Sequence, residues 1–171
     1  MNILYFKVSL PFSGKSTLAK KIAEGTNSIL ISFDSLFYEN ADELQINRNP
    51  EGWDIIRALA QNKIQELLSS SSVVYDDISM LFDHREQLRQ IARSTNSKAA
   101  LIYVDTPIDI IQQRQRENNI TKKRDHNIPE NFKLILSKFE IPKESEDPII
   151  FKPETIDDEL ICKLNDSPLS R

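Results

Sequence analysis

The stretch Ser9-Leu10-Pro11-Phe12-Ser13-Gly14-Lys15-Ser16-Thr17 decides how this chain is interpreted. An apolar run over residues 3–8 precedes it, and a helical pattern of apolar residues begins at Leu18. A strand, a turn ending in Gly-Lys-Ser-Thr and a helix form the context of a P-loop, or Walker A motif, in which backbone N–H groups and the helix dipole attract phosphate. We expect Lys15 to reach the β- and γ-phosphates of ATP and Ser16 to bind Mg²⁺. The residues expected to contact the nucleotide are Pro11, Phe12, Ser13, Gly14, Lys15, Ser16 and Thr17.

One position of the motif departs from the general pattern. Ser9 stands where the pattern has its first glycine, a residue without a Cβ to crowd the loop. Serine is the next smallest polar choice, so the loop is expected to close with mild strain. The alternative is a chance Gly-Lys-Ser in a surface turn, and the flanking strand and helix favour the P-loop.

Length and composition bound the class of protein. The chain has 171 residues, and we expect one kinase domain over residues 1–164, followed by a flexible tail over 165–171. A net charge of −4 gives no overall positive field to attract nucleic acid or a membrane surface. A lone Cys162 suits a reducing cytoplasm and is expected to be a small buried apolar residue. No signal peptide is visible, so a cytoplasmic location is expected.

Apolar runs and helical patterns alternate along the chain. Strands are predicted over residues 3–8, 28–33, 72–75, 99–104 and 148–151, and the middle three read as strands covered on both faces. Helices are predicted over residues 16–24, 53–68, 84–94, 108–118 and 129–139. The sequence therefore predicts an α/β fold of the P-loop NTPase class, a three-layer sandwich with a five-stranded, mostly parallel sheet, helices on both faces and a basic helical lid at about 114–130.

Acidic residues follow two of the predicted strands, at the sheet edge where ligands bind in such folds. Asp34 would accept the proton of an attacking hydroxyl, or orient it, across from the γ-phosphate; the alternative is a helix N-cap. Asp76 and Asp77 follow the third strand, and one of them would hold Mg²⁺ through a water or bind a substrate group. The pattern favours Asp76 for the metal and leaves open which of the two faces the site.

A basic segment lies late in the chain, in an otherwise acidic protein. It contains Arg114, Arg116, Lys122, Lys123 and Arg124. A basic flap over the phosphates would neutralise charge during transfer and exclude water, whereas the alternative is a solvated helix face. Arg114 and Arg116 lie two positions apart on a helix, so both cannot face the nucleotide well.

The chain resembles the small P-loop kinases related to polynucleotide kinase, zeta toxin, chloramphenicol phosphotransferase and seryl-tRNA kinase, with an ATP-binding domain of the AAA type. The resemblance runs from about residue 2 to 151 and rests on residues 10–19, 32–34, 73–77 and 102–107, together with Arg114, Arg124 and Phe139-Glu140-x-Pro142. It implies ATP and Mg²⁺ as cofactors and transfer of the γ-phosphoryl group to a hydroxyl. It also implies the phosphate role for Lys15, the Mg²⁺ role for Ser16, the base role for Asp34 and lid-arginine roles for Arg114 and Arg124.

Three functions are carried forward. The first is an ATP-dependent kinase for a small molecule or nucleotide, with an unidentified hydroxyl-bearing substrate. The second is a polynucleotide or RNA-end kinase; the basic segment favours it, and the net charge and Phe37, at the position where polynucleotide kinases carry an arginine, count against it. The third is a non-catalytic nucleotide-binding regulator with a degraded P-loop, which Ser9 and the stretch over 76–79 favour.

Overall fold

Five parallel strands form one sheet in the computed structural model, which describes residues 1–122, 129–152 and 157–166. The strand order is β2-β3-β1-β4-β5, and every neighbouring pair is parallel. Their bounds are β1 (Ile3–Val8), β2 (Ile29–Ser32), β3 (Val73–Asp76), β4 (Lys98–Val104) and β5 (Ile149–Phe151). The carboxyl ends of β1, β2 and β3 therefore meet at one edge of the sheet, where the P-loop leaves β1.

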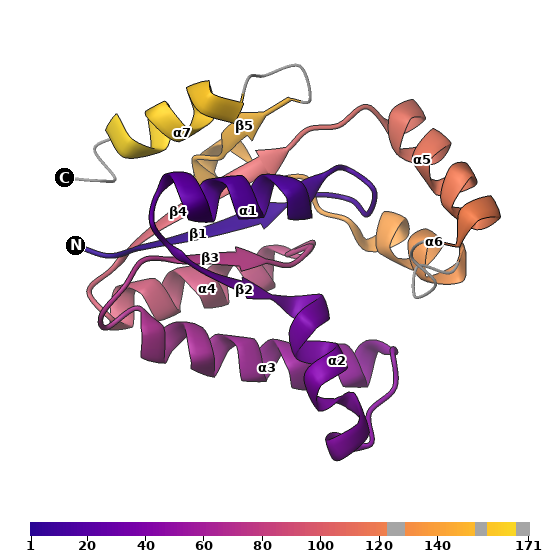
Figure 1. The fold of residues 1–171 in the computed structure, drawn as a ribbon, viewed down its shortest axis with the longest axis horizontal. Coiled ribbons are helices and arrows are strands. Elements are labelled where there is room, and N and C mark those ends of the chain that lie inside the picture. The colour runs from indigo at the N-terminus through magenta and orange to yellow at the C-terminus, as the bar shows by residue number, and fades with distance from the viewer. Residues whose placement is uncertain (123–128, 153–156, 167–171) are drawn as a thin grey trace.

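Helices cover both faces of the sheet (Figure 1). α1 (Lys15–Gly25) and α7 (Asp157–Asp166) lie on one face, and α3 (Pro50–Leu67) and α4 (Phe82–Ser94) lie on the other. Successive side chains of a strand point to opposite faces. On β1, Ile3 and Tyr5 accordingly belong to the apolar core beneath α1 and α7, while Leu4 and Phe6 belong to the core beneath α3 and α4.

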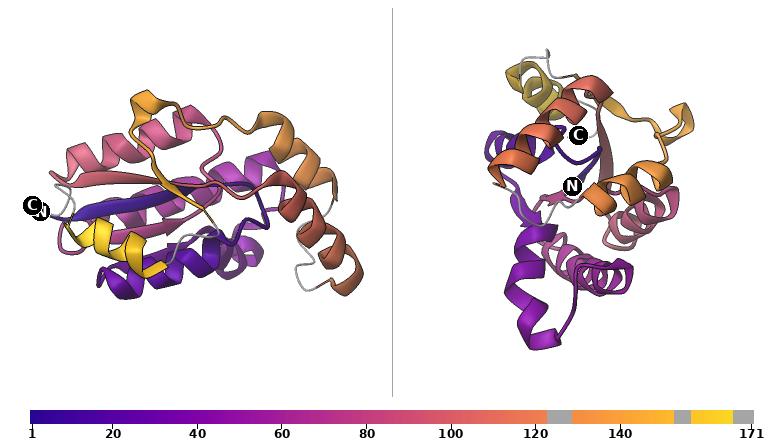
Figure 2. Two further views of the ribbon diagram at one scale, coloured as in Figure 1. Left: turned by 90° about the horizontal axis from the view of Figure 1, so that it is seen from above. Right: turned by 90° about the vertical axis from the view of Figure 1, so that its right-hand side faces the viewer.

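Three helices lie outside this sandwich or at its margin. α2 (Phe33–Leu44) follows β2 directly and leads into α3. α5 (Ile108–Thr121) and α6 (Pro129–Lys138) stand together at the end of the molecule opposite the two termini (Figure 2). We refer to α5 and α6 as the lid helices. A short 3-10 helix, η1 (Glu144–Glu146), connects them to β5.

The predicted fold class is confirmed, and the differences are local. β2 lies at the edge of the sheet, and although α1, α2 and α3 contact it, only Ile31 of its four residues is buried, so it is less fully covered than expected. Cys162 is exposed on α7, so the expectation of a buried cysteine is wrong. α7 also includes the first two residues of the expected tail, and 167–171 lie outside the described residues. In the described part of the chain, no helix combines the length and apolar character that a membrane crossing needs.

Candidate functional site

The loop between β1 and α1 has the backbone of a phosphate cradle. Gly14 is the N-cap of α1 with φ 94°, a left-handed conformation that favours glycine. The turn is closed by a hydrogen bond from the Ser13 amide to the Leu10 carbonyl at 3.4 Å, and Thr106 after β4 donates its hydroxyl to the Ser13 carbonyl at 3.0 Å. The first amides of α1 are therefore presented beside Lys15, in the arrangement that binds anions at helix N-termini.

Ser9 is accommodated without a left-handed backbone. Its side chain is fully buried, and its amide donates to the Ile78 carbonyl in the loop after β3 at 3.3 Å. The residues of the loop with positive φ are Phe12, at 68°, and Gly14. The mild strain expected at Ser9 lies instead at Phe12, a large side chain in a region that such residues rarely adopt.

Phe12 connects the cradle to the lid helices. Its ring packs 6.2 Å from the ring of Phe132 on α6, and both belong to a small apolar cluster with Ile111 on α5. Arg114, also on α5, donates from Nη1 to the Phe12 carbonyl at 2.9 Å. A Cβ added at Gly14 would lie 3.8 Å from the same nitrogen. The Arg114 guanidinium therefore lies over the phosphate-binding loop.

The rest of the basic segment is less closely placed. Arg116 is exposed on α5, in agreement with the expectation that it and Arg114 cannot share one role. Lys122 ends the helix in a left-handed conformation and is exposed. Arg124, expected as a second lid arginine, lies outside the described residues, as does Lys123.

Asp76 ends β3 beside the cradle. Its carboxylate is 7% exposed and pairs with the ammonium of Lys7 on β1, with 3.1 Å between Nζ and Oδ1. Burial alone would raise the pKa of Asp76, but the Lys7 and Lys15 cations and the Ser16 hydroxyl hold it below its ordinary value. Asp76 is therefore an ionised carboxylate next to the P-loop serine.

Lys7 was not identified from the sequence. It occupies the strand position after Phe6, its side chain is fully buried, and Nζ also donates to the Tyr75 carbonyl at 3.2 Å. Burial lowers the pKa of Lys7 to about 8, and the pairing with Asp76 opposes that effect. A lysine within an otherwise apolar central strand was the available signal, because lysine is rarely fully buried unless it is paired.

Asp77, the next residue at this edge of the sheet, pairs with a residue of α3. It is also buried, and its Oδ2 lies 3.9 Å from Nε of Arg57 on α3. His84 on α4 is near both, and burial followed by the Arg57 cation lowers its pKa. Nε of Arg57 and Nδ1 of His84 are buried without a hydrogen-bond partner among the described residues. Of these three residues, Asp77 and Arg57 line the cavity beyond the P-loop.

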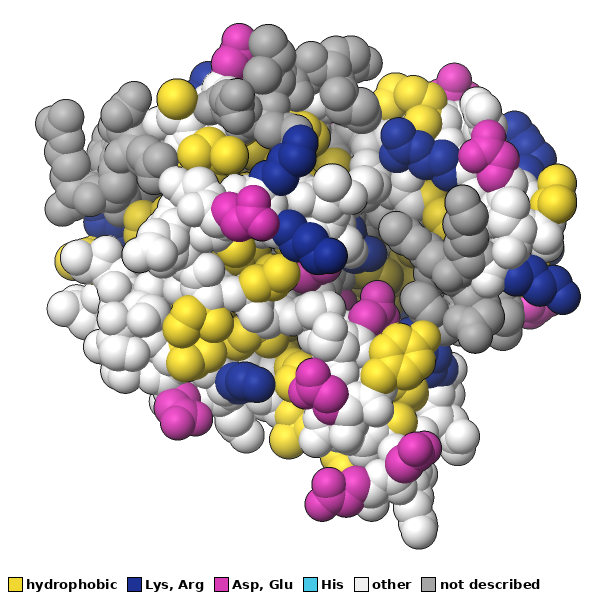
Figure 3. All heavy atoms as spheres, in the orientation of Figure 1, with side chains coloured by type: hydrophobic (Ala, Val, Ile, Leu, Met, Phe, Trp, Pro, Cys, Tyr) yellow, Lys and Arg dark blue, Asp and Glu magenta, His cyan; other side chains and the backbone are white. Residues whose placement is uncertain are grey.

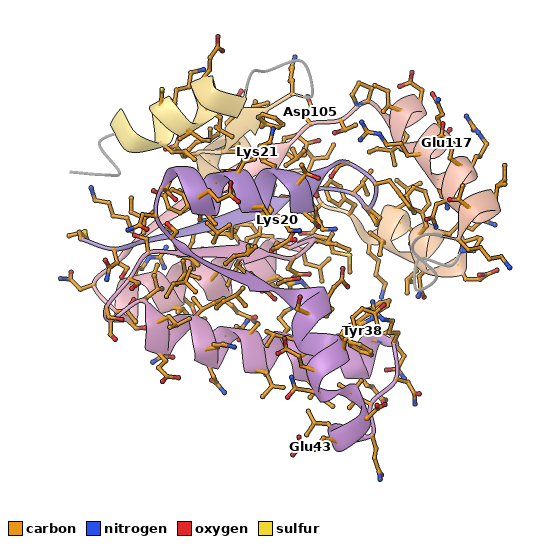
Figure 4. The ribbon with its side chains drawn as sticks, viewed as in Figure 1. Lys20, Lys21, Tyr38, Glu43, Asp105 and Glu117 are labelled. Atoms are coloured by element: carbon orange, nitrogen blue, oxygen red, sulfur yellow. The ribbon has the colours of Figure 1, made fainter. Side chains whose placement is uncertain are left out.

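Asp34 is the second residue of α2 and does not cap that helix. Ser32 is the N-cap, and its hydroxyl accepts from the Ser35 amide at 3.3 Å, so the capping alternative for Asp34 is wrong. The Asp34 carboxylate pairs with Arg48, whose Nη1 and Nη2 both lie 3.3 Å from Oδ1. The guanidinium of Arg48 also lies over two aromatic rings of α2. Its Cζ is 4.4 Å from the centroid of the Phe37 ring and 4.8 Å from that of Tyr38, which is labelled in Figure 4.

A cavity of about 370 Å³ joins these groups. It extends from Lys15 and Ser16 of the cradle to Asp34, and both Asp76 and Asp77 line it. Its remaining charged and aromatic lining comes from Lys20, Phe33, Arg48, Trp53 and Arg57. Figure 3 shows basic and acidic side chains interspersed around the hollow between the sheet and the lid helices. The volume matches a small-molecule site.

The groups beside Lys15 suit a magnesium ion. Mg²⁺ takes oxygen ligands and keeps several of its waters. Ser16 offers a hydroxyl. Oδ1 of Asp76 is buried and forms an ion pair with Lys7, but it accepts no well-aligned hydrogen bond from the described residues. An ionised carboxylate with an open acceptor position fits a metal-bound water at this point.

The chain therefore belongs to the class of P-loop proteins that share the fold of the small kinases. The chain belongs to the KTI12 family, described as chromatin associated protein KTI12, whose profile matches residues 6–156. No curated protein matches the sequence. The small P-loop kinase fold expected from the sequence is confirmed, whereas the particular families that the sequence resembles are not.

Three solved structures illustrate the shared fold. Chaetomium thermophilum Kti12 in complex with ADP-AlF3 has a TM-score of 0.78 and 17% identity, over 96% of this chain and 98% of that chain. Mycobacterium tuberculosis APS kinase, in complex with AMPPNP and APS, has a TM-score of 0.73 and 18% identity, over 96% of each chain. A gluconokinase from Sinorhizobium meliloti has a TM-score of 0.62 and 20% identity, over 95% of this chain and 87% of that one.

Proposed function

We propose that this protein binds ATP with Mg²⁺ at the P-loop and transfers the γ-phosphoryl group to a hydroxyl of a small molecule or nucleotide. The observation that carries the proposal is the cavity that continues from Lys15 to Asp34. A protein that only binds nucleotide needs the cradle, but it does not need a cavity that extends from the cradle to a carboxylate on α2. The charged groups along this extension suit a small polar acceptor.

On this proposal the cradle holds the triphosphate, with the Lys15 ammonium on the β- and γ-phosphates. Ser16 would bind Mg²⁺ directly, and Asp76 would accept a hydrogen bond from one of its waters. When bound, Mg²⁺ bridges phosphate oxygens and neutralises charge on them. Arg114, which lies over the loop through its bond to the Phe12 carbonyl, would add a cation on the lid side.

Asp34 would act on the acceptor. Its carboxylate is 44% exposed toward the cavity and accepts the proton of the attacking hydroxyl as oxygen bonds to the γ-phosphorus and the bond to the β–γ bridging oxygen breaks. Trp53 and Arg57 occupy the same face of α3, four residues apart, and both line the cavity. They would contact the body of the acceptor, the indole through an apolar face and the guanidinium through its charge.

Two solved structures with this fold support a nucleotide and an acceptor lying side by side in the cavity. The Kti12 structure contains ADP-AlF3, and the APS kinase structure contains both AMPPNP and APS. The first holds a nucleotide, and the second holds a nucleotide together with a second ligand in the same fold.

The proposal is tested by radiolabel transfer from γ-labelled ATP to panels of sugars, nucleosides and other hydroxyl compounds. The wild-type protein should label one class of acceptor, and Asp34→Asn should slow that transfer by about 10²- to 10⁴-fold while leaving ATP binding intact. Asp42→Asn, an exposed change on the same helix, should transfer like the wild type. Unchanged transfer by Asp34→Asn would remove the base assignment.

The same assay decides the other two functions. Labelling of oligonucleotide ends, with a steep loss of oligonucleotide binding as salt rises, would replace the small acceptor by a nucleic acid. ATP binding with no transfer to any acceptor and no hydrolysis would identify a non-catalytic nucleotide-binding protein.

A further inference from the structure

A fully buried lysine lies directly behind the phosphate cradle. Lys7 belongs to β1, the central strand of the sheet, one residue before the strand ends and the P-loop begins. Its Nζ lies 3.1 Å from Asp76 Oδ1 and 3.2 Å from the Tyr75 carbonyl. An ammonium with no exposed surface is costly unless a carboxylate compensates it, so Lys7 and Asp76 stabilise each other.

The partner of this lysine is Asp76, the carboxylate that would accept a hydrogen bond from a magnesium-bound water. Asp76 also interacts with the Ser16 hydroxyl and with the Lys15 cation, and all three of these residues line the cavity. A buried carboxylate at a nucleotide site would otherwise repel the phosphates until a divalent cation arrived. Here a cation that belongs to the chain already compensates it.

We propose that Lys7 is a resident cation of the nucleotide site, which fixes Asp76 in place and takes over part of the charge compensation of Mg²⁺, so that triphosphate binding depends only weakly on Mg²⁺. This inference rests on the proposed nucleotide cradle. It concerns a residue that the kinase proposal does not use, and it predicts a metal dependence that the cradle alone does not.

The physical reason is the sign of each interaction. The ammonium attracts a triphosphate tail and repels a divalent cation, and both interactions are strengthened by burial because the surrounding dielectric is low. The Asp76 carboxylate, by contrast, repels the triphosphate tail and attracts the divalent cation. With the two charges 3.1 Å apart, the nucleotide meets a nearly neutral pair, and the metal meets a carboxylate whose charge is already balanced.

The test is the ratio of the ATP dissociation constants in EDTA and in excess Mg²⁺, measured by isothermal titration calorimetry. The wild-type ratio should stay below roughly tenfold. Lys7→Met keeps an unbranched side chain, one atom shorter, but removes the cation. Asp76 is then uncompensated, and the ratio should exceed roughly a hundredfold. The double change Lys7→Met with Asp76→Asn removes both charges, and its ratio should return close to that of the wild type.

Two further variants keep the test decisive. Lys7→Gln, which keeps a donor for the Tyr75 carbonyl, replaces Lys7→Met if thermal unfolding shows that the methionine variant does not fold, and the same ratio is expected of it. Lys63→Met, the same change at an exposed position on α3, should leave the ratio unchanged.

A wild-type ratio above a hundredfold, or equal ratios in the wild type and a folded Lys7 variant, would overturn the role of Lys7. These results differ from failure of the proposed function. If the wild type takes up no ATP even with Mg²⁺, the nucleotide cradle is wrong and the role of Lys7 fails with it.

Discussion

Arg48, in the loop between α2 and α3, binds the carboxylate of Asp34. Both of its terminal guanidinium nitrogens lie 3.3 Å from Asp34 Oδ1. The guanidinium also lies over the rings of Phe37 and Tyr38. Polynucleotide kinases, which the sequence resembles, carry an arginine at the position of Phe37. In this chain the arginine that pairs with Asp34 comes from the loop before α3, and it lies over the ring of Phe37.

This contact predicts that Arg48→Lys destabilises the protein by about 1 kcal/mol, because an ammonium cannot pair with Asp34 and lie flat on two rings together. Urea unfolding measures the change. Lys63→Arg, a reverse exchange at an exposed site, should be neutral. Equal unfolding midpoints for Arg48→Lys and the wild type would show that the stacked contact contributes nothing.

Ser9 tests whether the P-loop is degraded. Its hydroxyl is buried without a hydrogen-bond partner among the described residues, and its backbone needs no glycine. Ser9→Ala should therefore raise the free energy of unfolding by about 1 kcal/mol, because a buried unsatisfied hydroxyl is removed. Ser9→Gly should leave ATP affinity within about threefold of the wild type. A tenfold or larger gain in affinity for Ser9→Gly would mean that serine does impair the loop.

The contact of Phe12 with Phe132 links the cradle to the lid helices. Phe132→Ala should loosen α5 and α6, seen as faster amide hydrogen exchange there with β1 still protected, and should weaken ATP binding by roughly tenfold. Leu136→Ala, at an exposed position of the same helix, is the matched control. If exchange in α5 is unaltered by Phe132→Ala, the cluster does not hold the lid helices.

A buried ion cluster joins α4 to the segment after the lid helices. Glu146 accepts from Arg85 Nε at 2.7 Å and Nη2 at 2.8 Å, and from Arg89 Nη2 at 3.1 Å. Burial would raise the pKa of Glu146, but the two arginines and the Lys143 amide lower it from 4.5 to about 2. Because the folded-state pKa is depressed, the stabilisation is present above pH 4.5 and is lost as the pH falls toward 2.

That difference in pKa corresponds to roughly 3 kcal/mol of folding free energy. Glu146→Gln should lower the free energy of unfolding by about that amount at pH 7, and its deficit should shrink as the pH is taken from 5 to 2. Glu144→Gln, an exposed neighbour in η1, should keep the acid sensitivity of the wild type. A deficit for Glu146→Gln that is constant from pH 7 to pH 2 would show that Glu146 does not titrate in this range.

Local patterns were sufficient to predict the fold. The P-loop between a strand and a helix, followed by alternating apolar runs, indicates a parallel sheet with its ligand edge beside Gly14, and strand β1 has the predicted bounds. The same rule placed Asp34 and Asp76 at that edge. α2 was missed because its buried apolar residues, Phe33, Leu36 and Phe37, cluster at its start, and the rest of the helix is mostly exposed.

Contacts between distant segments could not be predicted in the same way. No spacing in the sequence connects Arg48 with Asp34, Lys7 with Asp76 or Phe12 with Phe132. Each of these pairs depends on how loops leave the sheet and on which strands are neighbours. Lys7 meets Asp76 because β3 lies beside β1 in the sheet, and a strand order that placed β3 elsewhere would have left the lysine without a partner.

Calorimetric titration of ATP in excess Mg²⁺ into the wild type, Lys15→Ala and Lys63→Met tests the central claim most directly. The wild type and Lys63→Met should bind one ATP with equal affinity, and Lys15→Ala should bind roughly tenfold to a hundredfold more weakly, because it loses a charge-assisted contact with the phosphates. No uptake of ATP by the folded wild type, or equal affinity in all three proteins, would contradict a triphosphate cradle at Gly14.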